Sequence, residues 1–547
     1  MAEDAAEDPR HAKGDSPATP NHPRGGKVRA RARARASYAR VDSWQAPTLP
    51  VPTVAVTPSA VGGRLQTYAP NWTQLQLDPF VVSILSTGFR LPIVAPPPLT
   101  RRPYELRMAP DRFSLTLAQV EELVAKQAVE ELDPQSITPG YYSPIFVRPK
   151  KCGIKWRLIH NLRLFNRCYL ERPPYFRLST LQSARQSLGR SDFMISLDLQ
   201  DAYLHIPIHP DDRRFLRFVI GGRHFQWAVL TFGVSFAPWL FTRVTSPIVR
   251  FLHEARVQFL MYLDDGFCHD HSAAILARQR DFVITLLRQL GWLVNLEKSD
   301  LTPTRQLTFL GARLDSRAFT ATITVERRQR YMPLLEMALS RPRSLRQWQA
   351  VMGHLTSTQS LTQRGTLMLR PLQIWLNEHV REDKCTCQLT LPADLQPFVE
   401  WWLIPGNATT GVPIRPPAPT AHLYVDASTQ GWGAHLDAEQ TAGVWDDAMR
   451  TRHINFLELK AILLAARVWA PRLRHHQVMV HTDSSAAAWI INKQGSTKAH
   501  ALLWLAVELF TLADDESFNI RAVHIQGTKN VLADALSRPD APPPTEW

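Results

Sequence analysis

The sequence predicts an α/β protein that folds as more than one domain. A chain of 547 residues is too long to fold around a single hydrophobic core. Between about Tyr104 and Leu314, short β-like runs alternate with helical segments, which is typical of an α/β domain. A second stretch, residues 421–538, begins with strands, enters a long helix and returns to strand and helix. Two separate α/β regions are therefore expected.

Charge and composition favour a polyanionic partner. The chain has 63 Lys and Arg against 49 Asp and Glu, a net charge of +14 and a pI of about 9.8. Hydrophobic residues at 45% and charged residues at 20% are ordinary for a soluble globular protein, whereas 42 prolines are many. A basic protein without any nucleic-acid role is also compatible with these numbers.

The cysteines and the apolar runs indicate the compartment. Five cysteines form no paired framework, and their odd number suits a reducing environment. No apolar run reaches the roughly 18 residues that span a bilayer, and the acidic, polar amino terminus lacks the apolar core of a signal peptide. We expect a soluble intracellular protein without a membrane partner, in either the cytoplasm or the nucleus.

Residues 1–100 are predicted to be a disordered, basic and proline-rich region. From Arg24 to Arg40 there are seven Lys or Arg and no acid, and proline-rich sequence then runs to Pro98. Such composition cannot bury enough apolar surface to offset the entropy of the chain. The basic run suits RNA binding or nuclear targeting, and it is equally compatible with a solvated tail.

Five further segments follow from composition and periodicity. Residues 104–315 form the first α/β region, and residues 316–403 are helix-rich, with apolar residues at helical spacing in RSLRQWQAVMGHL. Residues 404–420 carry five prolines and are interpreted as an interdomain linker. Residues 421–538 form the second α/β region, and a proline-rich tail occupies residues 539–547.

Three aspartates of the first region lie in or beside apolar β-like runs. FMISLDLQDAYLHIPI contains Asp198, and VQFLMYLDDGFCHD contains Asp264 and Asp265. Carboxylates in such runs are costly to bury unless they bind a metal or a partner. Gly266 predicts a tight hairpin turn that presents the acids at its tip. If the two runs pair, the three carboxylates converge as a set that suits two magnesium ions; alone, the Asp-Asp pair is more often a polar turn.

The neighbouring segments resemble the motifs of reverse transcriptases, in the family's order over about 170 residues. Tyr262 to Asp265 matches the Tyr-x-Asp-Asp motif, and Ser196 to Tyr203 matches the first catalytic motif. LTFGVSFAPWLFTRV is similar to the template-and-nucleotide segment, SPIFVRPKKCGIKWRLIHNLRLFN to the fingers hairpin, and GWLVNLEKSDL to a later palm motif. The resemblance implies a right-hand polymerase with fingers and palm at 104–315 and a helical thumb or connection at 316–403.

The resemblance also implies nucleotide-binding residues. Lys150 and Arg157 would grip the incoming triphosphate, and Lys298 would donate a proton to pyrophosphate. Tyr203 would lie beneath the sugar and exclude a 2′-hydroxyl. Without the motifs, these cations would be interpreted as solvated surface and the tyrosine as a core aromatic.

The segment with Phe232 and Gly233 would contact template or nucleotide. Phe232 departs from the glutamine of retroviral enzymes and agrees with many retrotransposon enzymes.

The second α/β region carries four separated acids. Two lie in strand-like runs, one in an apolar helix and one in the last helix: Asp426, Asp483, Glu458 and Asp534. Acids in these settings are expensive unless they are satisfied, and four that converge suit two divalent ions and hydrolysis of a phosphodiester. Each acid alone is also explained as a surface or capping residue.

This segment resembles the ribonuclease H of retroelements over about 120 residues. The four acids fall on the family's Asp-Glu-Asp-Asp set, His524 falls on the histidine that helps proton transfer, and Asn530 is placed to orient Asp534. A ribonuclease H-like domain with a mixed sheet flanked by helices is implied. YVDASTQGWGAHL, NFLELKAILLA and INKQGST are most similar to DIRS-type retrotransposons, many of which have Asn where this chain has Ser484.

Together the resemblances imply an RNA-directed DNA polymerase with ribonuclease H activity. Its partners would be an RNA template, a DNA primer, the RNA–DNA hybrid and deoxynucleoside triphosphates, with two magnesium ions per active site and manganese as an alternative. A domesticated or decayed copy that only binds nucleic acid is the competing interpretation, although all seven carboxylates are present. Copying RNA into RNA conflicts with Tyr203. We find no protease, zinc-knuckle, integrase or recombinase motif and expect one product, or a fragment, of a larger element.

Overall fold

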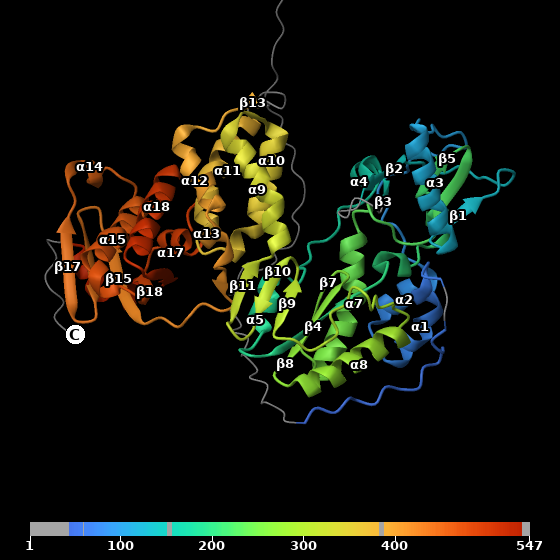
Figure 1. The fold of residues 1–547 in the computed structure, drawn as a ribbon, viewed down its shortest axis with the longest axis horizontal. Coiled ribbons are helices and arrows are strands. Elements are labelled where there is room, and N and C mark those ends of the chain that lie inside the picture. Colours follow the sequence, from blue (N-terminus) through green and yellow to red (C-terminus); the bar gives the residue numbers. More distant parts are fainter. Residues whose placement is uncertain (1–42, 58–59, 150–155, 382–387, 539–547) are drawn as a thin grey trace, which may run out of the picture. The chain divides into compact units, whose positions relative to one another are not determined.

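The computed structural model describes residues 43–57, 60–149, 156–381 and 388–538, whose elements are labelled in Figure 1. The chain divides into residues Met1–Gln45 and residues Ala46–Trp547, and the description below concerns the second unit. The basic run of residues 24–40, the triphosphate-binding candidate Lys150 and the proline-rich tail lie outside the described residues.

The amino-terminal part of this unit contains two helices, α1 (Arg64–Gln74) and α2 (Pro79–Thr87). The prediction that residues 1–100 are disordered is therefore wrong for residues 60–100. Proline content averaged over the whole region hid a helix with a buried face, on which Leu65, Tyr68 and Trp72 are completely inaccessible to solvent.

The segment from 110 to 227 contains a small sheet and a hairpin. The sheet has the order β1-β6-β5 and is antiparallel, and the hairpin pairs β2 with β3. The elements are α3 (Pro110–Ala125), β1 (Val129–Leu132), β2 (Ile145–Pro149), β3 (Trp156–His160), α4 (Arg163–Cys168), α5 (Leu181–Ser187), η1 (a 3₁₀ turn, Ala202–His205), α6 (Pro210–Arg213), β5 (Arg217–Ile220) and β6 (Arg223–Trp227).

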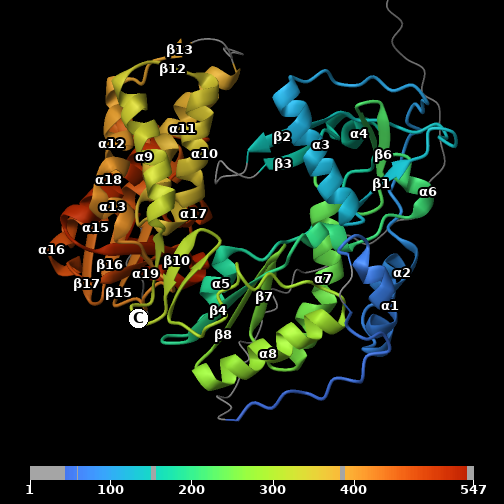
Figure 2. The ribbon, with the colours of Figure 1, turned by 45° about the vertical axis from the view of Figure 1, so that its right-hand side comes forward.

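A three-stranded antiparallel sheet of order β4-β8-β7 carries the first set of acids. Its strands are β4 (Phe193–Asp198), β7 (Phe259–Tyr262) and β8 (Asp265–Asp270). Helix α7 (Ala237–Glu254) packs against β7, and α8 (Ala273–Gln289) packs against β4 and β8, as Figure 2 shows. The helices bury the apolar side of the sheet and so hold the strand ends in place.

Residues 306–403 form a second small sheet and a helical bundle. The predicted helix-rich region contains α9 (Val325–Ser340), α10 (Leu345–Thr358), η2 (Gln359–Leu361), α11 (Gly365–Arg381), η3 (Ala393–Leu395) and α12 (Gln396–Leu403), with the two-residue strands β12 (Arg343–Ser344) and β13 (Gln388–Leu389). Its core is aromatic, since Tyr331, Trp348 and Trp402 are fully buried.

The proline-rich segment 404–420 is more ordered than a free linker. It contains α13 (Pro405–Thr409) and β14 (Val412–Pro413), and β14 completes the sheet β14-β11-β10-β9 with β9 (Gln306–Phe309), β10 (Ala312–Asp315) and β11 (Thr320–Ile323). Ala408 and Ile414 are buried in the same core as Leu314. Proline tolerates an edge strand because it needs no ladder donor there, so the prolines do not prevent this packing.

The carboxy-terminal region is a five-stranded mixed sheet with helices, as expected from its sequence. The strand order is β17-β16-β15-β18-β19; β17, β16 and β15 are antiparallel, whereas β15, β18 and β19 are parallel. The elements are β15 (Ala421–Ala427), β16 (Gly431–Leu436), β17 (Glu439–Val444), α14 (Asp447–Arg450), α15 (Ile454–Val468), α16 (Ala470–Leu473), β18 (Gln477–Thr482), α17 (Ser485–Asn492), α18 (His500–Asp515), β19 (Asn519–His524), η4 (Gly527–Lys529) and α19 (Val531–Leu536).

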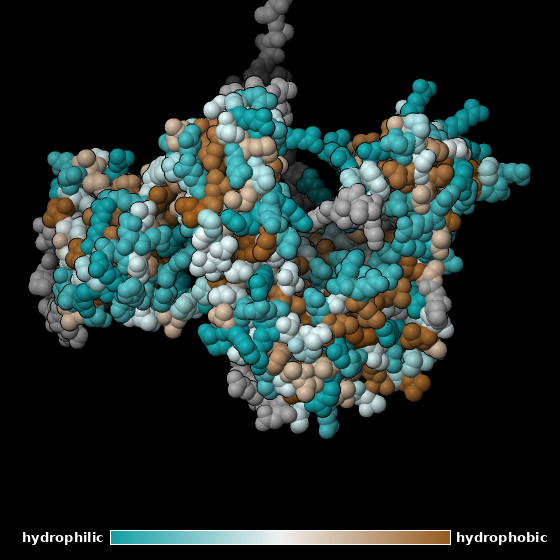
Figure 3. Space-filling model, viewed as in Figure 1, coloured by the Kyte–Doolittle hydropathy of each residue, from teal (hydrophilic) through white to brown (hydrophobic). Residues whose placement is uncertain are grey.

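One face of the molecule is mainly polar. Figure 3 shows hydrophilic residues over most of the visible face, with hydrophobic residues in scattered patches. Within the described part of the chain, no helix has both the length and the apolar character needed to cross a membrane.

Candidate active sites

The hairpin of β7 and β8 brings the three aspartates of the first region together. Asp198 ends β4 and is the register partner of Asp265, which begins β8. Side chains of directly opposed residues project to the same face of a sheet. Asp264 lies in the two-residue turn that joins the paired Tyr262 and Asp265, and Leu263 adopts a φ of 50° there. The two runs thus pair as expected, but the ligand atoms of the three carboxylates do not all lie within 4.8 Å of one another.

Gly266 does not form this turn, contrary to the prediction from sequence. It lies within β8, where an added Cβ would be 2.9 Å from the ring of Phe259. The glycine is therefore needed for close packing inside the sheet, and Leu263 and Asp264 make the turn.

Two of these carboxyl groups, those of Asp198 and Asp265, have pKa values above their ordinary range because of burial and neighbouring acids. Burial, followed by the charges of Asp264 and Asp198, raises the pKa of Asp265 to about 6. Burial also raises the pKa of Asp198, and the ammonium of Lys298 opposes that rise with its Nζ 3.9 Å from Oδ1. Divalent cations with oxygen ligands relieve this kind of repulsion, so these residues fit a metal-binding role.

Three aromatic side chains, Tyr203, Phe232 and Phe241, pack together near these acids. The ring of Tyr203 is buried, 4.8 Å from the ring of Phe232 and 5.3 Å from that of Phe241. Burial and the charge of Asp264 raise the pKa of Tyr203 to about 12, so the phenol stays neutral. Phe232 is exposed, and the guanidinium of Arg157 lies 5.6 Å from its ring centroid. Tyr203, Phe232 and Arg157 therefore lie next to one another.

Asn166 holds the loop that carries Phe232 and Gly233, and the sequence did not point to it. Its amide donates to the Gly233 carbonyl at 2.7 Å, and its carbonyl accepts from the Ser235 backbone at 3.0 Å. Gly233 has a φ of 106°, and a Cβ there would lie 3.0 Å from the His160 carbonyl. The loop conformation thus requires glycine at this position.

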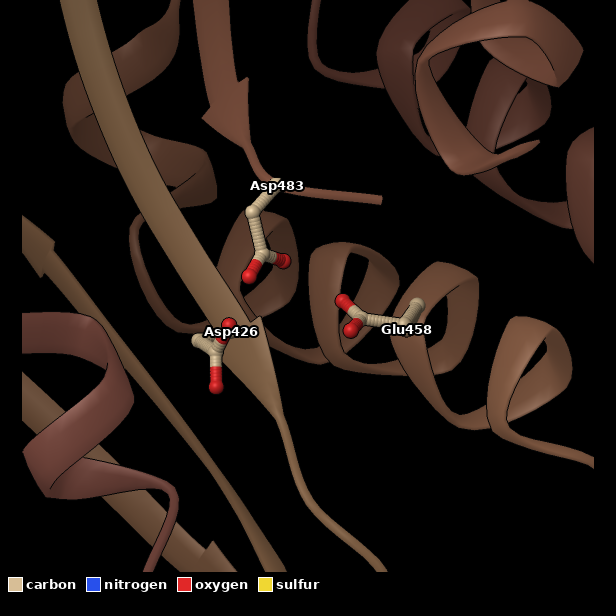
Figure 4. A group of neighbouring side chains, drawn as sticks. All are labelled: Asp426, Glu458 and Asp483. Carbon is tan, nitrogen blue, oxygen red and sulfur yellow. The ribbon is translucent and has the colours of Figure 1, made fainter. Parts of the chain in front are cut away.

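Three acids of the second region converge from different elements. Asp426 lies on β15, Glu458 on α15, and Asp483 directly follows β18. One carboxylate oxygen of each lies within 4.8 Å of the others, and Figure 4 shows the three side chains meeting. In the described ranges, no other group of three potential ligands meets this criterion.

Burial makes this triad electrostatically costly without a cation. Burial, and then the charges of Asp426 and Asp483, raise the pKa of Glu458 to about 9. The pKa of Asp426 rises to about 7, again mainly through burial. Oε2 of Glu458 is buried and has no hydrogen-bond partner among the described residues. An unsatisfied carboxylate oxygen in a set of three is what a divalent cation would complete.

Asp534, the fourth acid expected to converge, is not in this close group, although its charge helps to raise the pKa of Asp426. It lies on α19, and its Oδ1 pairs with Arg538 at 2.6 Å. The prediction that the side chain of Asn530 orients Asp534 is wrong. This side chain donates to the Val425 carbonyl at 3.0 Å and points toward Asp426. His524 is exposed and ends β19.

Ser537 is a site residue that the sequence did not reveal. Its hydroxyl, fully buried, donates to Oδ2 of Asp426 at 2.9 Å and lowers the pKa of that carboxyl against the effect of burial. The two residues are 111 positions apart, and only the packing of α19 on the sheet joins them.

Glu458→Gln is expected to stabilise the metal-free protein at pH 8. The fold raises the pKa of Glu458 from an ordinary 4.5 to about 9, so the folded state holds a proton that the unfolded chain releases between these values. The free energy of unfolding therefore falls as pH rises through this range. Glutamine cannot ionise, and a gain of about 1 kcal/mol or more should raise the melting temperature by a few degrees.

The check is a thermal melt of both proteins at pH 5 and pH 8, with and without magnesium. The difference in melting temperature between Glu458→Gln and the wild type should be smaller at pH 5. Magnesium should raise the melting temperature of the wild type more than that of the variant. Equal melting temperatures of the two proteins at pH 8 without metal would contradict a raised pKa of Glu458 in the folded state.

Comparison with known proteins identifies the first region. Residues 149–314 match the protein family described as "Reverse transcriptase (RNA-dependent DNA polymerase)".

The chain is 23% identical over 446 residues to the genome polyprotein of Petunia vein clearing virus (isolate Hohn), covering 79% of this chain and 19% of that polyprotein. It is 23% identical over 461 residues to the enzymatic polyprotein of Figwort mosaic virus (strain DxS), covering 79% and 64%. It is 32% identical over 209 residues to the intracisternal A-particle Pol-related polyprotein of mouse, covering 36% and 23%. The chain thus spans less than two thirds of the length of each of these relatives.

Solved structures agree on the fold. The foamy viral protease-reverse transcriptase in complex with RNA/DNA hybrid matches with a TM-score of 0.50 and 15% identity, over 77% of this chain and 55% of that one. The dRH form in complex with double-stranded DNA also matches with a TM-score of 0.50 and 15% identity, over 84% and 82%. At this identity the likeness concerns the fold alone, and it confirms the predicted α/β polymerase architecture.

Proposed function

We propose that this chain, whose residues 149–314 form a reverse transcriptase domain of the kind found in retroelement polyproteins, is an RNA-directed DNA polymerase that also degrades the RNA strand of RNA–DNA hybrids. The observation that carries the polymerase proposal is the pairing of β4 with β8, which opposes Asp198 to Asp265 beside Asp264 in the turn. Its substrates would be a primed RNA template and deoxynucleoside triphosphates.

The residues around the three aspartates suit nucleotide addition. Bound divalent metal would lower the pKa of the primer 3′-hydroxyl and neutralise the triphosphate, and Asp198, Asp264 and Asp265 would hold it. Lys298 lies 3.9 Å from Asp198 and is otherwise exposed, so its ammonium can donate a proton to the leaving pyrophosphate. Arg157, whose guanidinium lies 5.6 Å from the ring centroid of Phe232, would contact the triphosphate.

The ribonuclease H proposal is supported by the triad of Asp426, Glu458 and Asp483 on a mixed five-stranded sheet. These residues would hold the metal that supplies a hydroxide for hydrolysis. Asp534 would contribute from α19, and His524 would move protons during release of the product. A nuclease that cuts RNA in a hybrid is useful to an enzyme that makes the hybrid. The proposed DIRS-type affiliation depends on the sequence strings of this region alone.

The buried ring of Tyr203, which packs against Phe232 and Phe241, is the proposed selector of deoxynucleotides. Tyr203→Val is expected to reduce the preference for deoxynucleotides over ribonucleotides by about 10- to 100-fold, because exclusion of one small group by a pocket is worth about 1–3 kcal/mol. The measurement is kcat/KM for dGTP and GTP on the same primed template.

Tyr203→Phe is the matched control, since it keeps the ring and removes only the hydroxyl, and it should keep the selectivity of the wild type. Unchanged discrimination in Tyr203→Val would mean that the 2′-hydroxyl meets another residue.

A further inference from the structure

Helix α1, which precedes the matched residues 149–314, satisfies the carboxy-terminal end of α8. Three consecutive backbone carbonyls at the end of α8 accept hydrogen bonds from side chains of α1: Gln289 from Asn71 Nδ2 (2.7 Å), Leu290 from Trp72 Nε1 (2.9 Å) and Gly291 from Arg64 Nε (2.9 Å). Carbonyls at this end of a helix lack partners within the helix and carry the negative end of its dipole. A cation and two neutral donors therefore complement them.

The contact is buried and closely fitted. The donors Arg64, Asn71 and Trp72 are 4%, 2% and 0% exposed. Gly291 adopts a φ of +91°, and an added Cβ would lie 2.7 Å from Tyr68 on the same face of α1. These buried hydrogen bonds and the close approach of Tyr68 constrain the backbone at Gly291.

The chain runs from Gly291 directly into the polymerase site. The Leu293 carbonyl accepts from the Gln200 backbone at 2.8 Å, and the Asn295 backbone donates to the Asp198 carbonyl at 2.8 Å. Lys298, three residues later, has its Nζ 3.9 Å from Asp198. Residues 292–298 thus lie along the end of β4. Their position depends on the backbone of Gly291, the residue that precedes them.

A second path connects α1 with the tyrosine beside the acids. Gly63, the residue before α1, donates its backbone N–H to the Leu204 carbonyl at 2.9 Å, next to Tyr203 in η1. His205, fully buried in the same turn, receives the Leu293 backbone N–H on Nε2 at 3.2 Å. Helix α1, η1 and residues 292–298 are therefore joined to one another through hydrogen bonds.

We propose that α1 is a positioning element of the polymerase site, which sets the place of Lys298 relative to Asp198 through the backbone of residues 289–291. The inference rests on the proposed polymerase function and adds to it a part of the chain that lies outside the family match. A displacement of about 1 Å at reacting groups costs about 100-fold in rate, so loss of one donor of α1 has a measurable effect on synthesis.

The test is Trp72→Phe in the full chain, which keeps an aromatic ring and removes the donor to Leu290. Trp348→Phe is the matched control, because Trp348 is equally buried and donates its indole N–H to the Leu389 carbonyl at 3.3 Å in the helical bundle. Hydrogen exchange of residues 292–298 is measured first, without substrate. We expect at least tenfold faster exchange in Trp72→Phe (about 1.4 kcal/mol) and no change in these residues in Trp348→Phe.

Kinetic measurements then show whether the fixed position of residues 292–298 contributes to DNA synthesis. Trp72→Phe should lower kcat for nucleotide addition about tenfold at saturating substrates and leave hybrid cleavage unchanged. In a Lys298→Ala background it should lower kcat less than about twofold, because the two changes act through one group.

Unchanged exchange, losses that multiply in the double variant, or a Lys298→Ala protein with the kcat of the wild type would each overturn the proposal. A wild type without synthesis would instead refute the proposed function, and the exchange experiment would still decide whether α1 fixes residues 292–298.

Discussion

Replacement of Asp264 by Asn is expected to lower DNA synthesis on a primed RNA template by at least about 1,000-fold. Asp264 lies in the exposed turn between β7 and β8, close enough to Asp198 and Asp265 to raise the pKa of both carboxyls. Asparagine keeps the shape and removes the charge. Loss of several kcal/mol of metal-mediated stabilisation of the transition state corresponds to this factor. The measurement is extension of a labelled primer with dNTPs and magnesium.

Asp281→Asn provides the matched control, since Asp281 is an exposed aspartate on α8 that pairs only with the adjacent Arg280 among the contacts described. It should extend primers at the rate of the wild type. If wild type and Asp264→Asn were equally inert and both bound the hybrid, the chain would be a nucleic-acid-binding protein without polymerase activity.

Asp483→Asn is expected to leave DNA synthesis intact and to lower cleavage of the RNA strand by at least about 1,000-fold. Asp483 follows β18 and completes the group with Asp426 and Glu458. Asparagine cannot contribute the negative charge that a hydrolytic metal needs, which costs several kcal/mol in the transition state. A hybrid with labelled RNA measures the cleavage, and primer extension by the same preparation measures synthesis.

Asp447→Asn is the control for this variant, because the Asp447 side chain on α14 is fully exposed and lies in the same region. It should cleave normally. Loss of both activities in Asp483→Asn would contradict two separate catalytic sites and would point to a general defect in folding or hybrid binding.

The acids could be predicted from sequence because each lies within a short motif that also sets its local structure. A carboxylate inside an apolar strand, as at Asp198 or Asp426, is informative on its own, since burial of a charge needs a reason. The order of the motifs along the chain then predicts which strands come together. This reasoning succeeded for the β4–β8 pair and for three of the four acids on the mixed sheet, whereas Asp534 lies outside that group.

The contacts that support these acids could not be predicted, because they depend on packing between distant segments. Ser537 reaches Asp426 only through the placement of α19, and Asn530 is directed at the same acid and not at its neighbour in sequence, Asp534. Local rules also misled in two places. Gly266 has the composition of a turn but serves close packing with Phe259.

The second error concerned α1. Proline-rich sequence on either side lowered the average hydrophobicity of residues 1–100 and masked a helix whose face is fully buried. Its side chains donate hydrogen bonds to carbonyl groups more than 200 residues away, as in the bond from Trp72 to Leu290. No local sequence pattern predicts such a partner.

A single reaction tests the central claim most directly. The purified full chain is mixed with a labelled DNA primer on a separately labelled RNA template, magnesium and either dNTPs or NTPs. The proposed function predicts full-length DNA together with RNA fragments when dNTPs are supplied, and no extension with NTPs. Binding of the primed template without extension, or equal extension with both kinds of nucleotide, would contradict it.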